Sequence, residues 1–275
     1  MARIELADAP VLLTGASSGI GRALAFALAG RGARLAVAAR RRDALEEVAD
    51  LIAARGGTRP HVIEADLSRP GAAAELAGAA AEALGGVRVL VSNAGAGLVA
   101  AQGELGDGDG ARALFETNFW SPLALARALL PGMRGGGAIV NVTSTLQALP
   151  VPMLGHYGSA KAALAHATRT LRNELRGTGV TVLEYVPGAT DTDARDVGLL
   201  PWRGRPVRTL PPVSPESAAR AVVRAVERGR RRRVHPRPSL LPLEVPAIGR
   251  LAALAAARRI EVPRPAQPPR SSPRR

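Results

Sequence analysis

Two residues that can move a proton lie four positions apart in this chain, Tyr157 and Lys161, and Ser144 precedes the tyrosine by 13 positions. Side chains four residues apart share one face of a helix, so the phenol and the ammonium can point into the same space. A free tyrosine has a pKa of about 10, and a neighbouring ammonium stabilises the phenolate and lowers that pKa. A serine hydroxyl nearby could hold a carbonyl or alcohol oxygen against the phenol. The spacing predicts proton transfer to or from an oxygen atom.

The composition of the chain makes this pair unusual. Among 37 basic residues Lys161 is the only lysine, and Tyr157 and Tyr185 are the only tyrosines. Random placement would put that lysine four positions after a tyrosine with a probability of about 2 in 275. The alternative is a surface lysine beside a half-buried tyrosine. A chain that uses arginine at every other basic position favours the functional interpretation.

The neighbouring segments indicate how these residues are positioned. Residues 138–143, AIVNVT, are a short β-branched apolar run typical of a buried strand, and Ser144 stands at its end. Residues 158–177, GSAKAALAHATRTLRNELRG, are rich in Ala and Leu and end in glycine, which is typical of a helix. We therefore expect Ser144, at the end of the strand, to lie close to Tyr157 and Lys161 on the helix.

A glycine-rich turn, TGASSGIG at 14–21, follows an apolar strand-like run, PVLLTG, and leads into a predicted helix over 20–29. A phosphate-binding glycine motif requires this order of strand, turn and helix. Gly15 would permit the tight turn, Gly19 would let the backbone approach a pyrophosphate, and Gly21 would let the helix pack closely on the strand. A purely structural turn is the alternative.

The second predicted strand, within ARLAVAARR, ends at Arg40. A dinucleotide with a free ribose 2′-hydroxyl favours an acidic residue there, about 20 residues beyond the glycines. The chain has Arg40, Arg41 and Arg42 instead, and guanidinium groups suit a 2′-phosphate through bidentate hydrogen bonds. Arginine is frequent throughout this chain, so the missing acid is the firmer observation. The pattern predicts NADP(H) as the cofactor.

Strand-like and helix-like segments alternate along the rest of the chain. We expect strands at 61–66, 87–95 and 180–186, helices at 43–57, 71–86, 110–133 and 214–229, and an edge strand near 230–238. Alternation of this kind predicts an α/β fold with a parallel sheet. Asn118 lies in the middle of the longest helix among apolar neighbours, which favours burial with a hydrogen-bond partner.

Length and composition limit the number of domains and the kinds of site that the chain can contain. A chain of 275 residues with 47% apolar residues suits one large α/β domain with an appendage. It has no cysteine, which excludes disulfides and thiolate chemistry, and its four histidines show no ligand spacing, so no metal is expected. We see no basic leader followed by a long apolar run, and no apolar run of the roughly 20 residues that a membrane span needs. The expected location is the cytoplasm.

The basic charge is concentrated near the carboxyl end. From Glu216 onward there are 15 Arg and 4 Glu, a net charge of +11 out of +14. We predict a catalytic domain over 1–236 and an Arg/Pro-rich extension over 237–275, disordered in its last part, with one apolar helical piece at 248–257. This extension could make weak non-specific contacts with nucleic acid, contact a membrane surface through Leu251 and Leu254, or pack on a partner subunit. No specific nucleic-acid partner is expected.

Together these residues resemble the short-chain dehydrogenase/reductase family over roughly residues 8–235. The matches are TGASSGIG at 14–21, Asp66, Asn-Ala-Gly at 93–95, Asn118, Ser144, Tyr157 with Lys161, and PGATDT at 187–192. The glycine spacing is similar to that of the simple oxidoreductase branch and differs from that of the sugar-nucleotide branch. The Tyr-x3-Lys gap differs from the enoyl-reductase branch. Ser92 stands where the family more often has asparagine.

The resemblance implies a Rossmann-type, doubly wound, mostly parallel sheet of seven strands with helices on both faces. It also implies a catalytic tetrad in which Tyr157 is the acid/base and Ser144 orients the substrate oxygen. Lys161 would lower the tyrosine pKa and hold the nicotinamide ribose, and Asn118 would anchor a water in the proton relay. The chain would then be an NADP(H)-dependent oxidoreductase that transfers hydride between nicotinamide and a carbonyl or secondary alcohol.

The residues that the resemblance assigns to the cofactor are spread over most strand ends. They are Gly15, Ser17, Ser18, Gly19, Ile20, Gly21, Arg40, Asp66, Leu67, Asn93, Ala94, Gly95, Tyr157, Lys161, Pro187, Gly188, Thr190 and Thr192. Asp66 and Leu67 would contact the adenine, Asn93 the neighbouring ribose region, and Thr190 and Thr192 the nicotinamide end.

The substrate is expected to be a hydrophobic small molecule. The predicted pocket is lined by Leu146, Leu149, Met153, Leu154, His156 and the loop 188–213, which are mostly apolar. A homodimer or homotetramer is the expected assembly. The alternative function is a non-catalytic NADP-sensing or scaffold protein on the same fold, because a fold alone does not establish activity. The intact tetrad argues against that alternative.

Overall fold

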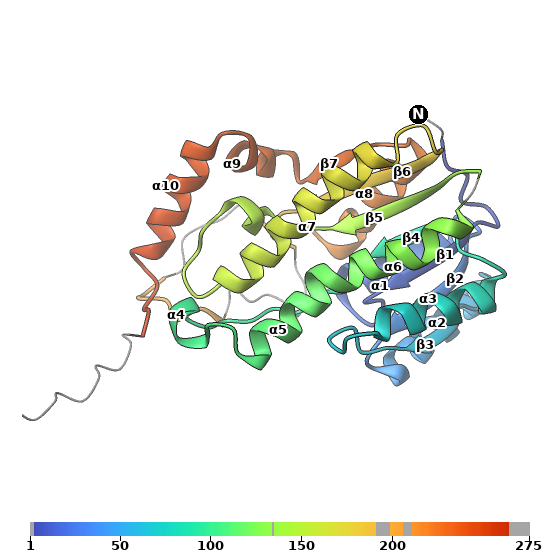
Figure 1. Ribbon diagram of the computed structural model, residues 1–275, viewed down its shortest axis with the longest axis horizontal. Helices are drawn as coiled ribbons and strands as arrows, with labels where there is room; N and C mark the ends of the chain where they lie inside the picture. The colour runs from blue at the N-terminus through green and yellow to red at the C-terminus, as the bar shows by residue number, and fades with distance from the viewer. Residues whose placement is uncertain (1–2, 134, 191–198, 206–210, 264–275) are drawn as a thin grey trace, which may run out of the picture.

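A single parallel sheet forms the centre of the protein in the computed structural model, which describes residues 3–133, 135–190, 199–205 and 211–263. Its seven strands follow the order β3-β2-β1-β4-β5-β6-β7, and every pair of neighbours is parallel. The strands are β1 (Pro10–Thr14), β2 (Arg34–Ala39), β3 (His61–Glu64), β4 (Val89–Ser92), β5 (Gly137–Val142), β6 (Val180–Pro187) and β7 (Arg232–His235). The expectation of a Rossmann-type α/β fold is confirmed (Figure 1).

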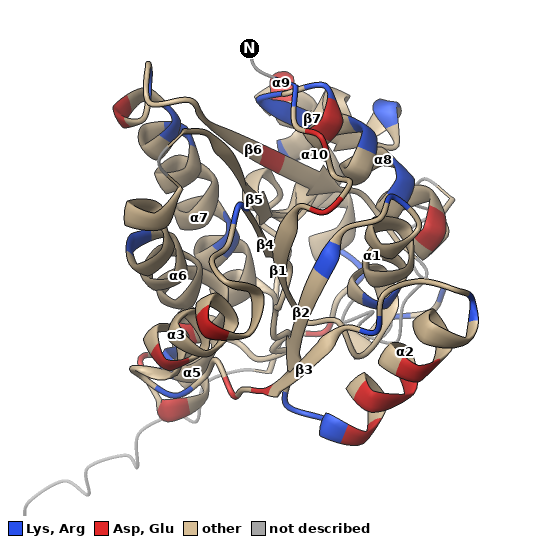
Figure 2. Ribbon diagram, turned by 90° about the vertical axis from the view of Figure 1, so that its right-hand side faces the viewer, with Lys and Arg blue, Asp and Glu red and all other residues tan. Residues whose placement is uncertain are grey.

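Helices cover both faces of the sheet. On one face lie α1 (Gly19–Ala29), α2 (Arg42–Ala54) and α8 (Pro215–Glu227). On the other lie α3 (Ala72–Leu84), α6 (Ser121–Leu129) and α7 (Gly155–Glu174), as Figure 2 shows in a view along the sheet. Successive residues of β1 separate the two cores, since Val11 and Leu13 pack with α1 and α8 whereas Leu12 packs with α3 and α6. Both faces are buried, which explains the nearly continuous apolar runs of the central strands.

The strand order reverses between β1 and β4, because the chain winds outward from β1 to β3 and then crosses to β4 and on to β7. In an open parallel sheet such a reversal opens a crevice at the carboxyl ends of the strands, where ligands bind. The predicted glycine turn at 14–21 and the predicted Asn-Ala-Gly break at 93–95 follow the two strands that flank this reversal.

The expected long helix over 110–133 is divided. It consists of α5 (Asp109–Phe115), one π-helical turn η1 (Glu116–Trp120), α6 and a short 3-10 turn η2 (Leu130–Gly132). The helix expected from 158 begins earlier, at Gly155, so that Tyr157 lies inside its first turn. Two short pieces have no clear sequence signal, α4 (Gln102–Leu105) and the 3-10 turn η3 (Thr145–Ala148).

The chain beyond β7 folds back over one end of the molecule. It forms a 3-10 turn η5 (Arg237–Leu240), then α9 (Leu241–Glu244) and α10 (Pro246–Ala257). Ala256 and Ile260 pack with Leu154 and Leu200 in a small separate core. In the described part of the chain, no single helix is long and apolar enough to cross a membrane, although the bent pair 237–244 and 246–257 would suffice by combined length and composition.

Candidate active site

One large cavity of about 1300 Å³ lies at the carboxyl ends of β1, β4, β5 and β6. Nearly all the residues predicted to contact a cofactor line it: Gly15, Ser17, Ser18, Gly19, Ile20, Gly21, Arg40, Asp66, Leu67, Asn93, Ala94, Gly95, Tyr157, Lys161, Pro187, Gly188 and Thr190. Ser144 lines it as well. Thr192, the last predicted member, lies outside the described residues. Segments more than 170 residues apart in sequence therefore meet around one space.

The glycine turn is compact enough to exclude side chains at two positions. A Cβ atom on Gly21 would lie 2.0 Å from the carbonyl oxygen of Gly15, and one on Gly15, where φ is +69°, would lie 2.8 Å from the Cα atom of Ala94. The turn leads into α1, whose N-cap Ser18 makes no side-chain capping bond and whose first turn has no acidic residue. The backbone amides at this helix end therefore remain available for an anionic group beside the cavity.

Asn93 ties β4 to the glycine turn. Its Nδ2 donates to the carbonyl oxygens of Thr14 (3.0 Å) and Gly15 (3.2 Å). The buried hydroxyl of Thr14 accepts hydrogen bonds from the backbone amides of Asn93 (3.1 Å) and Ala94 (3.0 Å). Thr14 was not predicted as a site residue, although it begins the motif at 14–21. Its role depends on a contact 79 residues along the chain, for which the motif itself gives no signal.

Two arginines lie next to the carboxyl end of β2. Arg40 and Arg41 both line the cavity, and the Arg41 guanidinium donates to the hydroxyl of Ser17 at 3.3 Å. Asp66 stands across from them after β3, where the hydroxyl and backbone amide of Ser68 donate to its carboxylate. These two bonds, with smaller contributions from Arg40 and another nearby arginine, lower the pKa of Asp66. Arg41 is thus a lining residue that the predicted site omitted.

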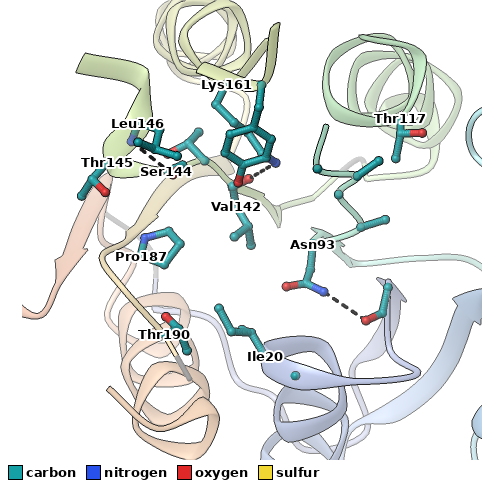
Figure 3. Close-up of a pocket in the computed structure, with 18 of the residues that line it drawn as sticks. Ile20, Asn93, Thr117, Val142, Ser144, Thr145, Leu146, Lys161, Pro187 and Thr190 are labelled. Atoms are coloured by element: carbon teal, nitrogen blue, oxygen red, sulfur yellow. Dashed lines mark hydrogen bonds between the residues drawn. The ribbon is translucent and has the colours of Figure 1, made fainter. Parts of the chain in front are cut away.

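Ser144 and Lys161 converge on the cavity wall opposite the glycine turn, as Figure 3 shows for Ser144, Lys161, Asn93 and Ile20. The Ser144 hydroxyl accepts from the backbone amide of Leu146 at 3.2 Å, which leaves its proton free to be donated. The Lys161 ammonium donates to the carbonyl oxygen of Val142 at 3.0 Å and lies 5.8 Å from the centre of the Tyr157 ring. Burial lowers the pKa of Lys161 to about 8.

Asn118 lies behind this wall, fully buried, in the π-helical turn η1. Its Nδ2 donates to the carbonyl oxygens of Ala96 (2.8 Å) and Leu114 (3.0 Å), whereas its Oδ1 has no partner among the described residues. A Cβ on Gly95 would lie 3.0 Å from that Oδ1 and 3.5 Å from the Lys161 nitrogen. The prediction of a buried, partnered Asn118 is confirmed, and π-turns of this kind often mark functional sites.

The predicted substrate wall needs a correction. Leu146 and Leu149 line the cavity, but Met153, Leu154 and His156 do not. His156 turns away, its Nε2 lying 2.7 Å from the carbonyl oxygen of Gly106, and Leu154 is buried in the small core beneath α10. The predicted loop 188–213 does line the cavity, through Gly188, Ala189, Thr190, Leu200 and Trp202. The rest of the outer wall, which was not predicted, comes from the carboxyl-terminal segment, through Pro238, Ser239, Leu241, Pro242, Ile248, Ala252, Ala253 and Ala256.

Known proteins share this combination of sequence and shape. The sequence model of the short chain dehydrogenase family matches residues 9–197, more than half of the chain. The chain belongs to the short-chain dehydrogenase family. This family consists of oxidoreductases, and the chain has the Rossmann-type sheet of its structural neighbours.

Relatives within the short-chain dehydrogenase family include an 11-beta-hydroxysteroid dehydrogenase A of Sesamum indicum, 34% identical over 82% of this chain and 68% of that protein. An uncharacterized oxidoreductase of Mycobacterium tuberculosis is 37% identical over 70% of this chain and 73% of its own length. The 11-beta-hydroxysteroid dehydrogenase 1A of Arabidopsis thaliana is 36% identical over 66% of this chain, but this covers only 52%, about half, of that protein.

Solved structures of short-chain dehydrogenases superpose on most of the chain. A Sphingobium yanoikuyae enzyme in complex with NADPH has a TM-score of 0.74 and 26% identity over 95% of this chain and 99% of its own. A Burkholderia phymatum enzyme in complex with NAD has a TM-score of 0.77 and 26% identity over 90% and 97% of the two chains.

Proposed function

We propose that this protein is an NADP(H)-dependent oxidoreductase that interconverts a hydrophobic ketone and secondary alcohol. The observation that carries the proposal is that Ser144, Tyr157 and Lys161 line the same cavity as the glycine turn, with the Lys161 ammonium 5.8 Å from the centre of the Tyr157 ring. A nicotinamide cofactor would supply and accept the hydride. The protein residues would bind both molecules and move the proton.

The cavity fits a dinucleotide at the end that holds the glycine turn. Backbone amides at the start of α1 would face its phosphates. The turn that presents these amides depends on glycine at 15 and 21, since a Cβ atom at either position would clash with neighbouring backbone atoms. Asp66 and Leu67 line the part that the adenine would occupy, and Pro187, Gly188 and Thr190 line the opposite end. Lys161 would hold the ribose next to the nicotinamide.

In the reductive direction Tyr157 would give its phenolic proton to the carbonyl oxygen as the carbonyl carbon accepts a hydride. Ser144 would donate a hydrogen bond to the same oxygen and so fix its position against the phenol. The buried Lys161 ammonium would stabilise the phenolate that remains. In the oxidative direction the phenolate would take the proton of the alcohol, and the same groups would serve in reverse.

The preference for NADP(H) is supported by Arg40 and Arg41 on the cavity wall and by the lack of an acid at the end of β2. We expect Arg40→Ala and Arg41→Ala each to weaken NADPH binding by about tenfold or more and to leave NADH binding nearly unchanged. Arg42→Ala is a matched control, because the neighbouring Arg42 pairs with Glu46 on α2 at 3.1 Å and does not line the cavity. Equal affinities of the parent protein for NADPH and NADH would refute the preference.

A bulky apolar substrate is supported by two observations. The wall beyond Ser144 is built from aliphatic side chains, among them Leu146, Leu149, Val151 and Ile248. Several relatives are named hydroxysteroid dehydrogenases. A steroid or a molecule of similar size and polarity is therefore the first class to test, by following NADPH absorbance with a panel of ketones.

The two tyrosines of the chain provide the decisive test of the proton donor. Tyr157→Phe should abolish turnover, a loss of at least about a thousandfold, while NADPH affinity stays within a few fold, since the hydroxyl acts on the substrate. Tyr185→Phe is the matched control, because Tyr185 is fully buried in β6 and does not line the cavity. Activity retained by Tyr157→Phe would place the acid elsewhere.

A further inference from the structure

The helix α10 packs its small residues against the protein and exposes its large apolar residues to solvent. Gly249, Ala253 and Ala256 are buried, whereas Leu251 and Leu254 are 67% and 49% exposed. A surface helix of a globular protein normally turns its largest apolar side chains toward the core and charged residues toward water. This reversed arrangement indicates that the outer face of α10 meets something other than water.

Exposed apolar side chains are concentrated around this helix. Of the nine large apolar residues that are exposed in the described part of the chain, seven lie between 240 and 262, and we call them the C-terminal patch: Leu240, Leu241, Val245, Ile248, Leu251, Leu254 and Val262. Figure 1 shows α9 and α10 along the outer edge of the molecule, at the end away from β3. Large exposed apolar side chains gathered on one segment in this way indicate an interaction site.

Arginines accompany the C-terminal patch. Arg237, Arg250, Arg258 and Arg259 are exposed, and none has an ion-pair partner among the described residues. The two acids of the segment are already paired, Glu244 with Arg232 and Glu261 with Arg203. The sequence that follows, from 264 to 275, adds four arginines and no acid. The partner of the patch must therefore be apolar and negatively charged at once.

A second copy of the chain satisfies only half of this requirement. In a two-fold dimer the same surface meets itself, so the unpaired arginines would face one another. A bilayer with anionic headgroups provides both an apolar layer and negative charge. With 12 residues α10 is about 18 Å long, too short for a hydrocarbon core of about 30 Å, and therefore suited to lie in the interface. We propose that the C-terminal patch docks this protein on the surface of an anionic lipid bilayer.

The patch is continuous with the mouth of the cavity. Leu241 and Ile248 are exposed on the surface and also line the cavity, so an apolar path leads from the patch to the wall that holds Ser144. A hydrophobic substrate dissolved in the bilayer could enter by this path without crossing water. This consequence rests on the proposed function, whereas docking itself does not.

Co-sedimentation with vesicles tests the docking directly. Full-length protein should partition onto vesicles of phosphatidylcholine with a third phosphatidylserine, and at least tenfold less onto pure phosphatidylcholine. Arg250→Gln and Arg258→Gln should each weaken binding about fivefold, since an arginine near an anionic surface contributes by about that factor. Leu251→Gln with Leu254→Gln should weaken it at least tenfold. None of these residues lines the cavity, so turnover of a water-soluble ketone should not change.

Matched substitutions elsewhere separate docking from general charge and hydrophobicity. Arg127→Gln and Arg176→Gln alter exposed arginines on α6 and after α7, and Trp120→Gln alters an exposed apolar residue of η1. These should bind vesicles like the parent. Three results would overturn the proposal: no vesicle binding by the parent, equal losses in the control variants, or a lower mass in size exclusion for Leu251→Gln/Leu254→Gln with vesicle binding intact, which would assign the patch to a subunit interface. Circular dichroism of each variant verifies that it is folded.

Discussion

Lys161 is buried, and burial of its ammonium group lowers the free energy of unfolding of the cofactor-free protein. Burial lowers its pKa to about 8, against about 10.4 in an unfolded chain. Between these values the unfolded chain binds more protons than the folded one, so this group makes the free energy of unfolding rise with pH over that window. Below pH 8 the cost of burying the ammonium is present in full.

We therefore expect the stability difference between the parent and Lys161→Met to depend on pH. Relative to the variant, the cofactor-free parent should gain roughly 3 kcal/mol between pH 7 and pH 11, since each pKa unit corresponds to about 1.4 kcal/mol. Urea unfolding at closely spaced pH values measures the difference. Parallel stability curves for the two proteins would mean that Lys161 titrates normally, and Lys161→Arg provides a control that keeps the charge.

The second tyrosine carries a polar atom that the fold does not use. The Tyr185 hydroxyl is buried without a hydrogen-bond partner among the described residues, and burial raises its pKa. Burying an unpaired hydroxyl is unfavourable. Tyr185→Phe should therefore raise the free energy of unfolding by about 1 kcal/mol and leave turnover unchanged, as measured by chemical denaturation and by steady-state kinetics. A loss of stability would reveal a partner for this hydroxyl, such as a bound water.

At the residue scale the sequence was informative where a residue type is rare or conformationally special. The single lysine, the glycines at 15, 19 and 21, and the buried Asn118 could all be predicted, because their types are unusual for their surroundings. Thr14 could not, since its two accepted hydrogen bonds come from a distant strand end. The rejection of His156 as a pocket residue likewise depends on a contact with Gly106 that no local pattern encodes.

Among the elements, β6 and β7 share a partly buried ionic contact that links the turn after Ser144 to the C-terminal segment. Glu184 is fully buried on β6, accepts from the side-chain amide of Gln147 in η3 at 3.1 Å, and lies 3.6 Å from the Arg232 guanidinium on β7. Arg232 also pairs with Glu244 of α9. Through Arg232, the Glu184 carboxylate thus connects the turn that follows Ser144 with α9, which lines the outer part of the cavity.

Removing the cation of this contact should be costly. Arg232→Met removes the nearest cation from the buried Glu184 carboxylate and leaves Arg172 as a remaining positive charge that interacts with it. We therefore expect the free energy of unfolding to fall by about 2 kcal/mol. In Glu184→Gln/Arg232→Met the charge is gone and the amide can still face Gln147, so most of the loss should be recovered. Arg31→Met, which breaks the exposed pair with Glu227, should cost little and serves as control. Additive losses in the double variant would show that the two side chains do not interact.

The order of strands and helices followed well from periodicity, because each strand of a sheet buried on both faces is a short apolar run and each long helix has a helix-favouring composition. The helix expected over 214–229 is α8, and its hydroxyl cap is Ser214, which accepts from the amide of Ser217 at 3.2 Å. The π-turn inside 110–133 was not predictable, since the hydrogen bond from Asn118 to the Ala96 carbonyl joins residues 22 positions apart, which no local pattern encodes. The short helices α4 and α9 span four residues each and are too brief to show a period.

At the scale of the whole molecule the cavity has two parts of different origin. The part expected to hold the adenine and the phosphates is built by the glycine turn and the ends of β1 to β4, all within residues 10–95. Much of the outer wall of the cavity comes from the segment after β7, through side chains of η5, α9 and α10. That segment packs closely, since a Cβ on Gly188 would lie 2.4 Å from the Ser239 hydroxyl oxygen. Sequence alone predicted the helical piece near 248–257 but not where it docks, because an Ala-rich, Pro-interrupted segment fits many apolar surfaces.

This division predicts what truncation after Pro236 should do. The predicted catalytic domain, 1–236, retains every described residue expected to hold the cofactor, so NADPH affinity should stay within a few fold of the full-length value. The apolar wall would be lost, and burial of a hydrophobic substrate would fall with it, so KM for such a substrate should rise at least tenfold while KM for a small water-soluble ketone changes little. Fluorescence titration with NADPH and steady-state kinetics on the two substrates measure both effects. Loss of NADPH binding in a truncated protein that remains folded would mean that the C-terminal segment belongs to the cofactor site and that the domain boundary lies beyond Pro236.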